Sequence, residues 1–274
     1  IGNRNHRFLT FFGEAPMFLR ILSFFYSQPC LVCSKIDTHS HRFGVCLPCI
    51  RKQRKVQKEK TMDNVCEICS QIMTAEAEKC EYCSSRFVFF SQVVSLRIRL
   101  SWERKLLQLC KFQNERILST YFALDFAKKI HEFKNQPDII FLLPSKDLKI
   151  GRDYHPADAI LRRLCKKWNI KQMNGIKKVS QEKQSGKSYF ERFQHAKKAF
   201  QLIKKDRTWN GLHILIIDDI FTTGASLNEV ARMLLGAGAE RVSCMVLLSN
   251  EGDWIEWKFR SKMILESWSF QVRF

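Results

Sequence analysis

The chain has 274 residues, with 46 Lys and Arg against 27 Asp and Glu for a formal net charge of +19, and it contains 11 cysteines. A hydrophobic content of 45% is ordinary for a globular protein and excludes a disordered chain, while 11 glycines and 6 prolines are too few for collagen or a flexible linker. The length allows one large domain or two smaller ones.

The positive charge is concentrated in two stretches. Lys and Arg exceed Asp and Glu by 6 in residues 17–65 and by 11 in residues 151–210, whereas residues 211–274 carry a net charge of −2. This asymmetry predicts a polyanionic partner, either nucleic acid or a phosphorylated ligand. The alternative is a solvated, Lys-rich surface.

The apolar N-terminal stretch from Phe8 to Tyr26 is interrupted by charged residues and by Pro16. It therefore lacks the roughly 18–20 apolar residues of a membrane span, and it has no small-residue cleavage site of a signal peptide. Residues from Met17 to Tyr26 predict a short amphipathic helix, and Met17 is a candidate translation start because residue 1 is Ile. We expect residues 1–29 to form an N-terminal extension of a cytoplasmic protein without a stable membrane span.

Eight cysteines form four C-x-x-C pairs: Cys30/Cys33, Cys46/Cys49, Cys66/Cys69 and Cys80/Cys83. Two residues between thiolates let a tight turn present both sulfurs to one metal ion, and two such turns complete a tetrahedral site. The segments 34–45 and 70–79 between paired turns have the length of a short hairpin. The spacing therefore predicts a double zinc ribbon with up to two structural Zn²⁺ ions, which contribute folding free energy and not catalysis.

Other uses of these cysteines are less favoured. Disulfides need an oxidising compartment, and four pairs in one segment exceed what thioredoxin-like chemistry requires. The spacing leaves open whether the pairs combine sequentially or interleave, with His39 and His41 as substitute ligands. The basic residues 51–60 between the ribbons could contact a phosphate backbone or form a solvated connector.

After residue 84, helical and strand patterns alternate, which predicts a parallel α/β sheet. The remaining cysteines, Cys110, Cys165 and Cys244, lie in these patterns and are expected to be buried. Helices are predicted over 101–133, 156–168, 189–199 and 225–235, and strands over 139–143, 176–179, 212–217 and 241–248.

The segment from Ile214 to Ser226 carries the strongest functional signal. A buried strand ends in Asp218 and Asp219, and a short loop with hydroxyls and Gly224 leads into a helix. Backbone N–H groups of such a loop and the helix N-terminus form an anion site, and glycine allows close approach. The carboxylates would repel a phosphate, so they suit sugar hydroxyls or a divalent metal. The pattern predicts a sugar phosphate ligand, and it is neither a Walker loop nor a Rossmann fingerprint.

This segment resembles the phosphoribosyl pyrophosphate signature of type I phosphoribosyltransferases. The resemblance implies that Asp218 and Asp219 contact the ribose hydroxyls. It further implies that the 5′-phosphate is held by Phe221, Thr222, Thr223, Gly224, Ala225 and Ser226.

From about Met17 to Asn250 the chain is similar to the ComF family, whose members join a single or double zinc ribbon to a phosphoribosyltransferase-like domain. The resemblance implies a double ribbon over residues 30–84 and a type I phosphoribosyltransferase-like α/β domain, a parallel sheet flanked by helices, over residues 85–250. Residues 251–274 would be a C-terminal extension that adds an edge strand or covers the N-terminal helix.

Further elements carry this resemblance. Leu109-Cys-Lys-Phe112 is similar to the family's Lys-aromatic element, and Leu143-Pro-Ser-Lys146 resembles the loop that holds pyrophosphate, which implicates Ser145 and Lys146. In Gly151-Arg-Asp-Tyr-His-Pro156, Arg152 and Tyr154 take the basic and aromatic places of the family's Arg-Gly-Phe-Asn, whose glycine and asparagine are missing. The family pattern Gln…Arg-x-x-Asn is matched by Gln184, Arg192 and His195, with His195 in place of Asn.

The resemblance implies a ligand, phosphoribosyl pyrophosphate with Mg²⁺, and a reaction in which pyrophosphate is displaced from the ribose anomeric carbon. Mg²⁺ would serve as template and Lewis acid. Lys146, Arg152 and Arg192 would stabilise the leaving group. No general base for an acceptor is evident in the sequence.

Because the family is linked to natural competence, the resemblance also implies a role in DNA uptake and natural transformation. The alternative hypothesis is a non-catalytic zinc-ribbon adaptor that binds single-stranded DNA in the cytoplasm. Its partners would be single-stranded DNA and a competence helicase or recombination protein. Basic side chains would follow the phosphates, and Phe112 or Tyr154 could stack on bases. For Phe112, core packing is the favoured expectation.

Overall fold

The computed structural model describes residues 28–60, 65–71, 80–84, 86–133, 135–144, 155–170, 172–173, 175–180, 189–203 and 209–249. The chain divides into two compact units after Arg51. The amphipathic helix at Met17, the residues Ser145, Lys146, Arg152, Tyr154 and Gln184, and the segment 251–274 lie outside the described residues. Among those that are described, no helix combines the length and apolar content that a membrane crossing requires.

In the smaller unit, Asp37 organises the segment between Cys33 and Cys46. Ser40 N–H donates to Asp37 Oδ1 (2.6 Å) and Leu47 N–H donates to Oδ2 (2.9 Å), so one carboxylate caps α2 (Thr38–Phe43) and binds the first residue of α3 (Leu47–Lys60). Gly44, with φ of +73°, ends α2. The predicted hairpin is therefore wrong for this interval, because a capping box and a C-terminal glycine favour a short helix.

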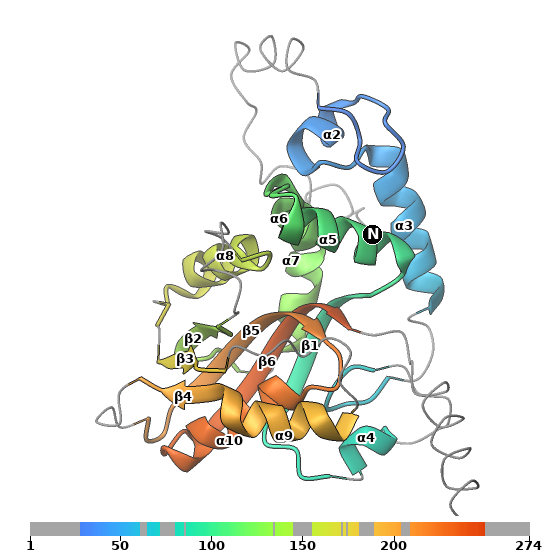
Figure 1. Cartoon of the computed structure of the whole chain (residues 1–274). Coiled ribbons are helices and arrows are strands. Elements are labelled where there is room, and N and C mark those ends of the chain that lie inside the picture. The colour runs from blue at the N-terminus through green and yellow to red at the C-terminus, as the bar shows by residue number, and fades with distance from the viewer. Residues whose placement is uncertain are drawn as a thin grey trace, which may run out of the picture. The chain divides into compact units, whose positions relative to one another are not determined.

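The larger unit contains a four-stranded parallel sheet in the order β1-β6-β5-β2 (Figure 1), with strands β1 (Gln92–Ile98), β2 (Ile139–Leu142), β5 (His213–Phe221) and β6 (Arg241–Ser249). Residues 214–217 and 244–248 are fully buried, as expected when helices cover both faces of a parallel sheet. The three strands predicted for this sheet are confirmed, whereas β1 was not predicted.

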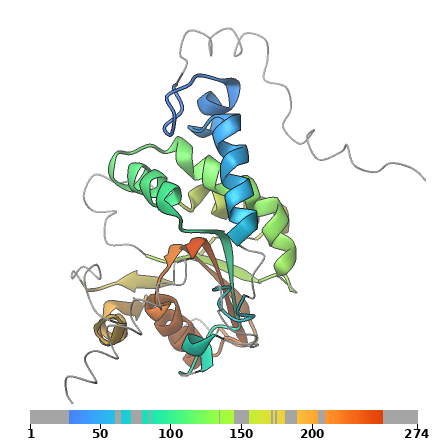
Figure 2. The same cartoon turned by 90° about the vertical axis from the view of Figure 1, so that its right-hand side faces the viewer.

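Helices cover both faces of this sheet (Figures 1 and 2). One face is covered by α9 (Tyr189–Ala199) and α10 (Ala225–Gly236), and the other by α5 (Ser101–Phe112), α6 (Ile117–Phe122), α7 (Phe126–Lys129) and α8 (Asp158–Trp168). Short elements complete the unit: α4 (Glu81–Ser84), η1 (Ala123–Asp125) and η2 (Ile130–Glu132).

The prediction of one continuous helix over 101–133 is wrong. Asn114 adopts a left-handed conformation with φ of +60°, which its short polar side chain tolerates. Its side-chain oxygen accepts a hydrogen bond from Arg116 Nε (3.1 Å) and its carbonyl accepts one from Arg116 N–H (2.8 Å). This turn ends α5 and redirects the chain into α6.

A small antiparallel sheet of β3 (Ile176–Lys178) and β4 (Phe200–Leu202) lies next to β2 in the fold. Met173 N–H donates to the Ile140 carbonyl (3.0 Å), which ties the approach to β3 to the edge of the main sheet. Gly175 packs so closely against the Phe141 ring that a Cβ would come within 2.7 Å of it. These contacts hold β3 beside the carboxyl end of the main sheet.

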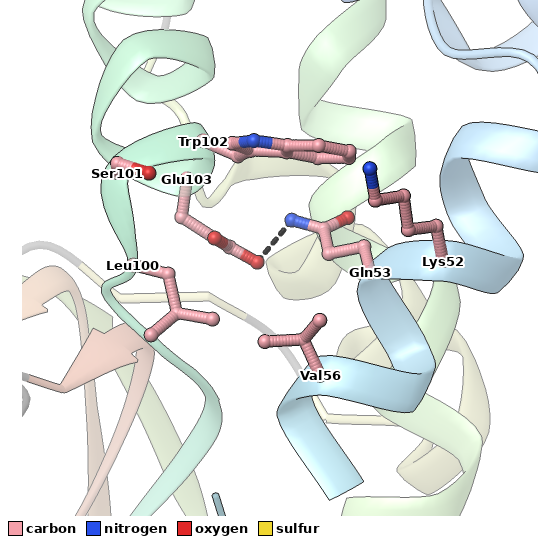
Figure 3. Close-up of a pocket in the computed structure, with 7 residues that line it drawn as sticks. All are labelled: Lys52, Gln53, Val56, Leu100, Ser101, Trp102 and Glu103. Atoms are coloured by element: carbon pink, nitrogen blue, oxygen red, sulfur yellow. Dashed lines mark hydrogen bonds between the residues drawn. The ribbon is translucent and has the colours of Figure 1, made fainter. Parts of the chain in front are cut away.

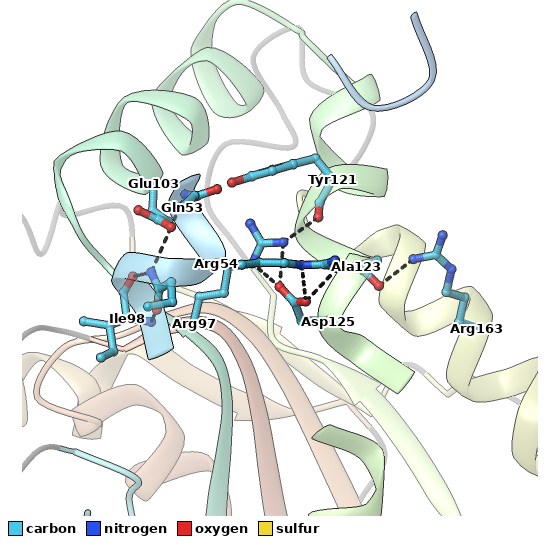
Figure 4. A network of polar contacts seen from close by, with 10 residues as sticks. Gln53, Arg54, Arg97, Ile98, Glu103, Tyr121, Ala123, Asp125 and Arg163 are labelled. Carbon is cyan, nitrogen blue, oxygen red and sulfur yellow. Dashed lines mark hydrogen bonds and ion pairs between the residues drawn. The ribbon is translucent and has the colours of Figure 1, made fainter. Parts of the chain in front are cut away.

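Strand β1 buries a charged residue, Arg97, whose side chain is 3% exposed (Figure 4). Arg97 Nε donates to Asp125 Oδ2 (2.8 Å), Nη2 donates to the Tyr121 carbonyl (3.1 Å), and the guanidinium stacks 4.2 Å from the Tyr121 ring centroid. Asp125 also pairs with Arg54, whose side chain is 43% exposed (3.0 Å). Asp125 therefore holds one buried and one exposed arginine.

We expect Asp125→Ala to lower the free energy of unfolding by about 3 kcal/mol, because it leaves the buried Arg97 charge without its carboxylate. Arg54→Ala, which removes only the exposed partner, should cost under about 1 kcal/mol. Urea denaturation of the two variants measures the difference. Equal losses would contradict the assigned role of burial.

Candidate functional site

The cysteines form two tetrads by sequential pairing, one of Cys30, Cys33, Cys46 and Cys49, the other of Cys66, Cys69, Cys80 and Cys83. In each tetrad the four sulfurs lie within 4.8 Å of one another, and no cysteine of the chain forms a disulfide. Sulfurs of different pairs approach to 3.5 Å in both tetrads, close to the roughly 3.8 Å that tetrahedral Zn–S bonds of about 2.3 Å would give. Both tetrads could hold zinc.

The first tetrad belongs to the smaller unit and the second to the larger one. In the first, Cys30 Sγ accepts hydrogen bonds from the N–H groups of Val32 (3.4 Å) and Cys46 (3.3 Å), as metal-bound thiolates do. Burial and the neighbouring thiols raise the pKa of Cys49, so its thiolate form needs a cation nearby. In the second tetrad, Cys66, Cys69 and Cys83 are buried in the hydrophobic core.

The acid pair lies within β5, which continues beyond the predicted end at residue 217 through Phe221. Asp219 N–H donates to Asp218 Oδ1 (2.8 Å), and both side chains are partly buried. Burial, together with the adjacent Asp219 carboxylate, raises the pKa of Asp218 to about 8. The protonated form of Asp218 is therefore favoured near neutral pH.

Two lysines from distant elements face these acids. Lys111, near the end of α5, forms an ion pair with Asp219 Oδ2. Lys111 and Lys178 of β3 both act to lower the pKa of Asp218, against the larger effect of burial. The sequence placed Lys111 in the Lys-aromatic element without a role, and it offered no signal for Lys178, because the fold alone brings β3 to this edge.

His155 is the third group that sequence reasoning missed. Its Nε2 lies 4.0 Å from Asp219 Oδ2, and its side chain is 3% exposed. Its Nδ1 accepts from Ala157 N–H (3.1 Å), which leaves the proton of the neutral ring on Nε2, directed at the acid pair. His155, Asp218 and Asp219 lie close enough to hold a metal ion; for a hard cation such as Mg²⁺ the carboxylate oxygens are the suitable ligands.

The loop of residues 222–224, here called the phosphate loop, joins β5 to α10. Gly224 has φ of +67°, a conformation that glycine adopts without strain, and its carbonyl accepts Asn228 N–H (2.8 Å). Ala225 and Ser226 form the first turn of α10, and Ala225 N–H donates to Thr223 Oγ1 (3.3 Å). The predicted ligand residues from Thr222 to Ser226 therefore lie at the junction between the end of β5 and the start of α10.

Two further residues were predicted to bind the ligand, Phe221 and Arg192. Phe221 is the last residue of β5, and its fully buried ring packs edge-on against Phe90, with centroids 6.1 Å apart. Its side chain therefore belongs to the core and not to a ligand site. Arg192 lies in α9, and in the same helix the buried His195 hydrogen-bonds through Nε2 to Ser180 Oγ (2.8 Å).

Helix α5 carries a second feature at its other end. A cavity of about 400 Å³ is lined there by Lys52, Gln53, Val56, Leu100, Ser101, Trp102 and Glu103 (Figure 3). Lys52 Nζ lies 5.5 Å from the Trp102 ring centroid, and Gln53 donates a hydrogen bond to the buried Glu103 carboxyl. Phe112, at the C-terminal end of α5, is 73% exposed, so the expectation of core packing for this ring is wrong.

Comparison with known proteins supports the family resemblance. The chain is 27% identical over 227 residues to Competence protein F of Haemophilus influenzae, an alignment that covers 80% of this chain and 95% of that protein. It is 27% identical over 216 residues to Competence protein ComFC of Bacillus subtilis, covering 75% and 84%. The family described as phosphoribosyl transferase domain matches residues 155–274. The larger unit has a type I phosphoribosyltransferase-like fold.

Similar solved structures include an allosteric regulatory enzyme of purine biosynthesis, 15% identical with a TM-score of 0.29, which covers 47% of this chain and of which this chain spans 24%. Another is a hypoxanthine phosphoribosyltransferase from Staphylococcus aureus, 12% identical with a TM-score of 0.30, covering 49% of this chain and 67% of that one. These TM-scores are low, so the fold is assigned from the family match and the parallel sheet.

The raised pKa of Asp218 predicts how stability depends on pH. Its pKa is about 8 in the folded chain against 3.8 when unfolded, so between these values the folded chain holds a proton that unfolding releases. The free energy of unfolding of the wild-type chain therefore falls as pH rises from about 4 to about 8. Asp218→Asn removes this pH dependence. Urea denaturation without added Mg²⁺ should therefore show that the variant is stabilised relative to the wild type more at pH 8.5 than at pH 6.

Asp219→Asn is the matched control for this prediction. It removes one cause of the raised Asp218 pKa but also breaks the ion pair with Lys111, and burial still raises the Asp218 pKa, so its stabilisation at high pH should be smaller than that of Asp218→Asn. A pH-independent effect of Asp218→Asn would contradict the assigned protonation of Asp218.

Proposed function

Because the chain is ComF-like and carries a phosphoribosyl transferase domain, we propose that it binds phosphoribosyl pyrophosphate with Mg²⁺ and catalyses phosphoribosyl transfer. The observation that carries this proposal is the placement of Asp218 and Asp219 near the end of β5, separated by two residues from the phosphate loop that leads into α10. Carboxylates accept hydrogen bonds from sugar hydroxyls, and the neighbouring helix N-terminus binds anions, so the two together suit a sugar phosphate.

In this proposal each group of the described site has one task. The 5′-phosphate accepts hydrogen bonds from backbone N–H groups of the phosphate loop and of Ala225 and Ser226, at the positive end of α10. Asp219, paired with Lys111, accepts a hydrogen bond from a ribose hydroxyl, and Asp218 does so once its proton is lost. The carboxylate oxygens of this pair would hold bound Mg²⁺, which supplies charge neutralisation at the pyrophosphate.

The leaving group requires cations. Displacement breaks the bond between the anomeric carbon and a pyrophosphate oxygen while the acceptor forms the new bond, so negative charge grows on pyrophosphate. We assign its stabilisation to Lys146 and Arg152, with Ser145 as a hydrogen-bond donor, and extend the assignment to Arg192. His155 Nε2–H would orient Asp219 and exchange this contact for the sugar when the ligand binds.

We further propose a role in DNA uptake and natural transformation, since both relatives are named competence proteins. Eleven free cysteines suit the reducing conditions of the cytoplasm, where we place the chain. We propose that structural Zn²⁺ occupies both tetrads. A competence helicase or recombination protein remains the proposed protein partner.

The binding proposal predicts that Asp218→Asn/Asp219→Asn weakens phosphoribosyl pyrophosphate binding about 100-fold or more. The estimate follows from losing two hydrogen bonds to charged groups, each contributing roughly 1.5–3 kcal/mol. Isothermal titration with Mg²⁺ measures it, and Glu240→Gln, at an exposed acid of the same unit, is the control. Unchanged affinity in the double variant would remove the acid pair from the site.

A second candidate function, binding of single-stranded DNA, is favoured by the surface of α5. Trp102 and Phe112 stand at its two ends, roughly 15 Å apart at 1.5 Å per residue. Exposed Arg104 and Lys105 lie between them, and the cavity under Trp102 could accept one base. An aromatic residue at each end of a basic helix suits a strand that stacks bases and pairs its phosphates with cations.

We expect Trp102→Ala and Phe112→Ala each to weaken oligo-dT binding about tenfold, since stacking of one base contributes roughly 1–3 kcal/mol. Lys105→Ala should instead lower the salt dependence of binding by about 0.7 in the log–log slope. Fluorescence anisotropy at several salt concentrations separates these effects. Phe87→Ala is the control, because Phe87 is 88% exposed on a different segment, and an equal loss there would contradict the proposal.

A further inference from the structure

The carbonyl groups of the phosphate loop are bound by residues that flank the second cysteine tetrad. Arg86 Nη2 donates to the Thr223 carbonyl (3.0 Å), and Gln71 Nε2 lies 3.5 Å from the Thr222 carbonyl. Arg86 follows Cys83 by three residues, and Gln71 follows Cys69 by two. Two successive peptide groups of the loop are therefore held from the side of the tetrad.

This anchoring orients the opposite side of the loop. In a trans peptide the C=O and the following N–H point in opposite directions, and the chain has no cis peptide among its described residues. When Gln71 and Arg86 hold the carbonyls of Thr222 and Thr223, the N–H groups of Thr223 and Gly224 face away from the tetrad. These are N–H groups that a bound phosphate would need.

Arg86 is itself held in place. Its guanidinium carbon lies 4.6 Å from the Phe193 ring centroid, in α9. Its segment is fixed to α10 by Asn228, whose Oδ1 accepts Phe89 N–H (2.8 Å) and whose Nδ2 donates to the Phe87 carbonyl (3.1 Å). Asn228 is buried, so these bonds are shielded from water. The backbone segment and the ring that flank Arg86 therefore hold its guanidinium in position to donate to the Thr223 carbonyl.

The second tetrad fixes the other anchor. Cys66 N–H donates to the Gln71 carbonyl (2.9 Å), and Ile68 and Ser70 bond to Val93 of β1, at 2.6 Å each. Gln71 is only 2% exposed. Cys66, Cys69 and Cys83 share one hydrophobic core with Phe90 and with Phe221 and Leu227, which lie before and after the loop in the chain. A metal ion in this tetrad would fix both segments that reach the loop.

We propose that Arg86 is a positioning residue of the phosphate loop, and that metal binding at the second tetrad is coupled through Arg86 and Gln71 to anion binding by the loop. This inference rests on the proposed function for the identity of the anion. The loop conformation itself is tested without any ligand.

The first experiment compares Arg86→Ala and Arg86→Lys with the wild-type full chain, using Arg162→Ala, at an exposed position of α8, as control. Hydrogen exchange of amides 223–226 in the ligand-free, zinc-loaded protein should be at least tenfold faster in Arg86→Ala and partly restored in Arg86→Lys. Phosphoribosyl pyrophosphate affinity with Mg²⁺ should fall about tenfold, while zinc content by native mass spectrometry stays unchanged. Unchanged loop exchange in Arg86→Ala would overturn the inference.

The second experiment compares the two tetrads. Cys80→Ser and Cys33→Ser should each lose one zinc ion, but only Cys80→Ser should accelerate loop exchange. Equal effects on the loop, or none from Cys80→Ser, would overturn the coupling. If Cys80→Ser does not fold, Arg86→Ala with Gln71→Ala decides it, since the pair should accelerate exchange more than either change alone. If the wild type fails to bind phosphoribosyl pyrophosphate, the proposed function fails while the exchange results still test the loop.

Discussion

Two carboxylates on adjacent residues of a partly buried strand repel each other, and the neighbouring groups of the site offset this repulsion. The repulsion is met in two ways: the pKa of Asp218 is raised to about 8, and Asp219 forms an ion pair with Lys111, with His155 nearby. These partners come from α5 and from the turn before α8, and Lys178 comes from β3. The acid pair is therefore stable only in the complete fold, which makes a local motif dependent on distant elements.

The parts of the site predicted from sequence are those with local causes. An apolar run followed by two acids, two threonines and a glycine specifies β5, the phosphate loop and α10 within thirteen residues, 214–226. Lys111, His155 and Lys178 are separated from the acids by at least forty residues, and no periodicity marks them. Strand β1 was missed because Arg97 interrupts its apolar pattern, and its burial is made tolerable by Asp125 of η1 together with the Tyr121 carbonyl.

The cysteines show the same division between local and distant information. Their spacing predicts four turns that each present two sulfurs, and the structure combines these turns in sequential order. The interval 34–45 forms a helix and not a hairpin because Asp37 caps the helix at its start and Gly44 ends it. Phe221 belongs to the signature, yet its side chain packs into the core. The sequence could not predict this, because β5 continues four residues beyond its apolar run.

The shared core of the second tetrad bears on how the chain could be divided. Cys66, Cys69 and Cys83 pack in the same cluster as Phe90, Val93 and Phe221, so a fragment beginning after residue 84 would expose one wall of its own interior. Such a fragment would keep every residue of the transferase signature and still lose apolar contacts and a metal site. The core of this phosphoribosyltransferase-like fold therefore includes a cysteine motif that, by sequence, looks like a separable module.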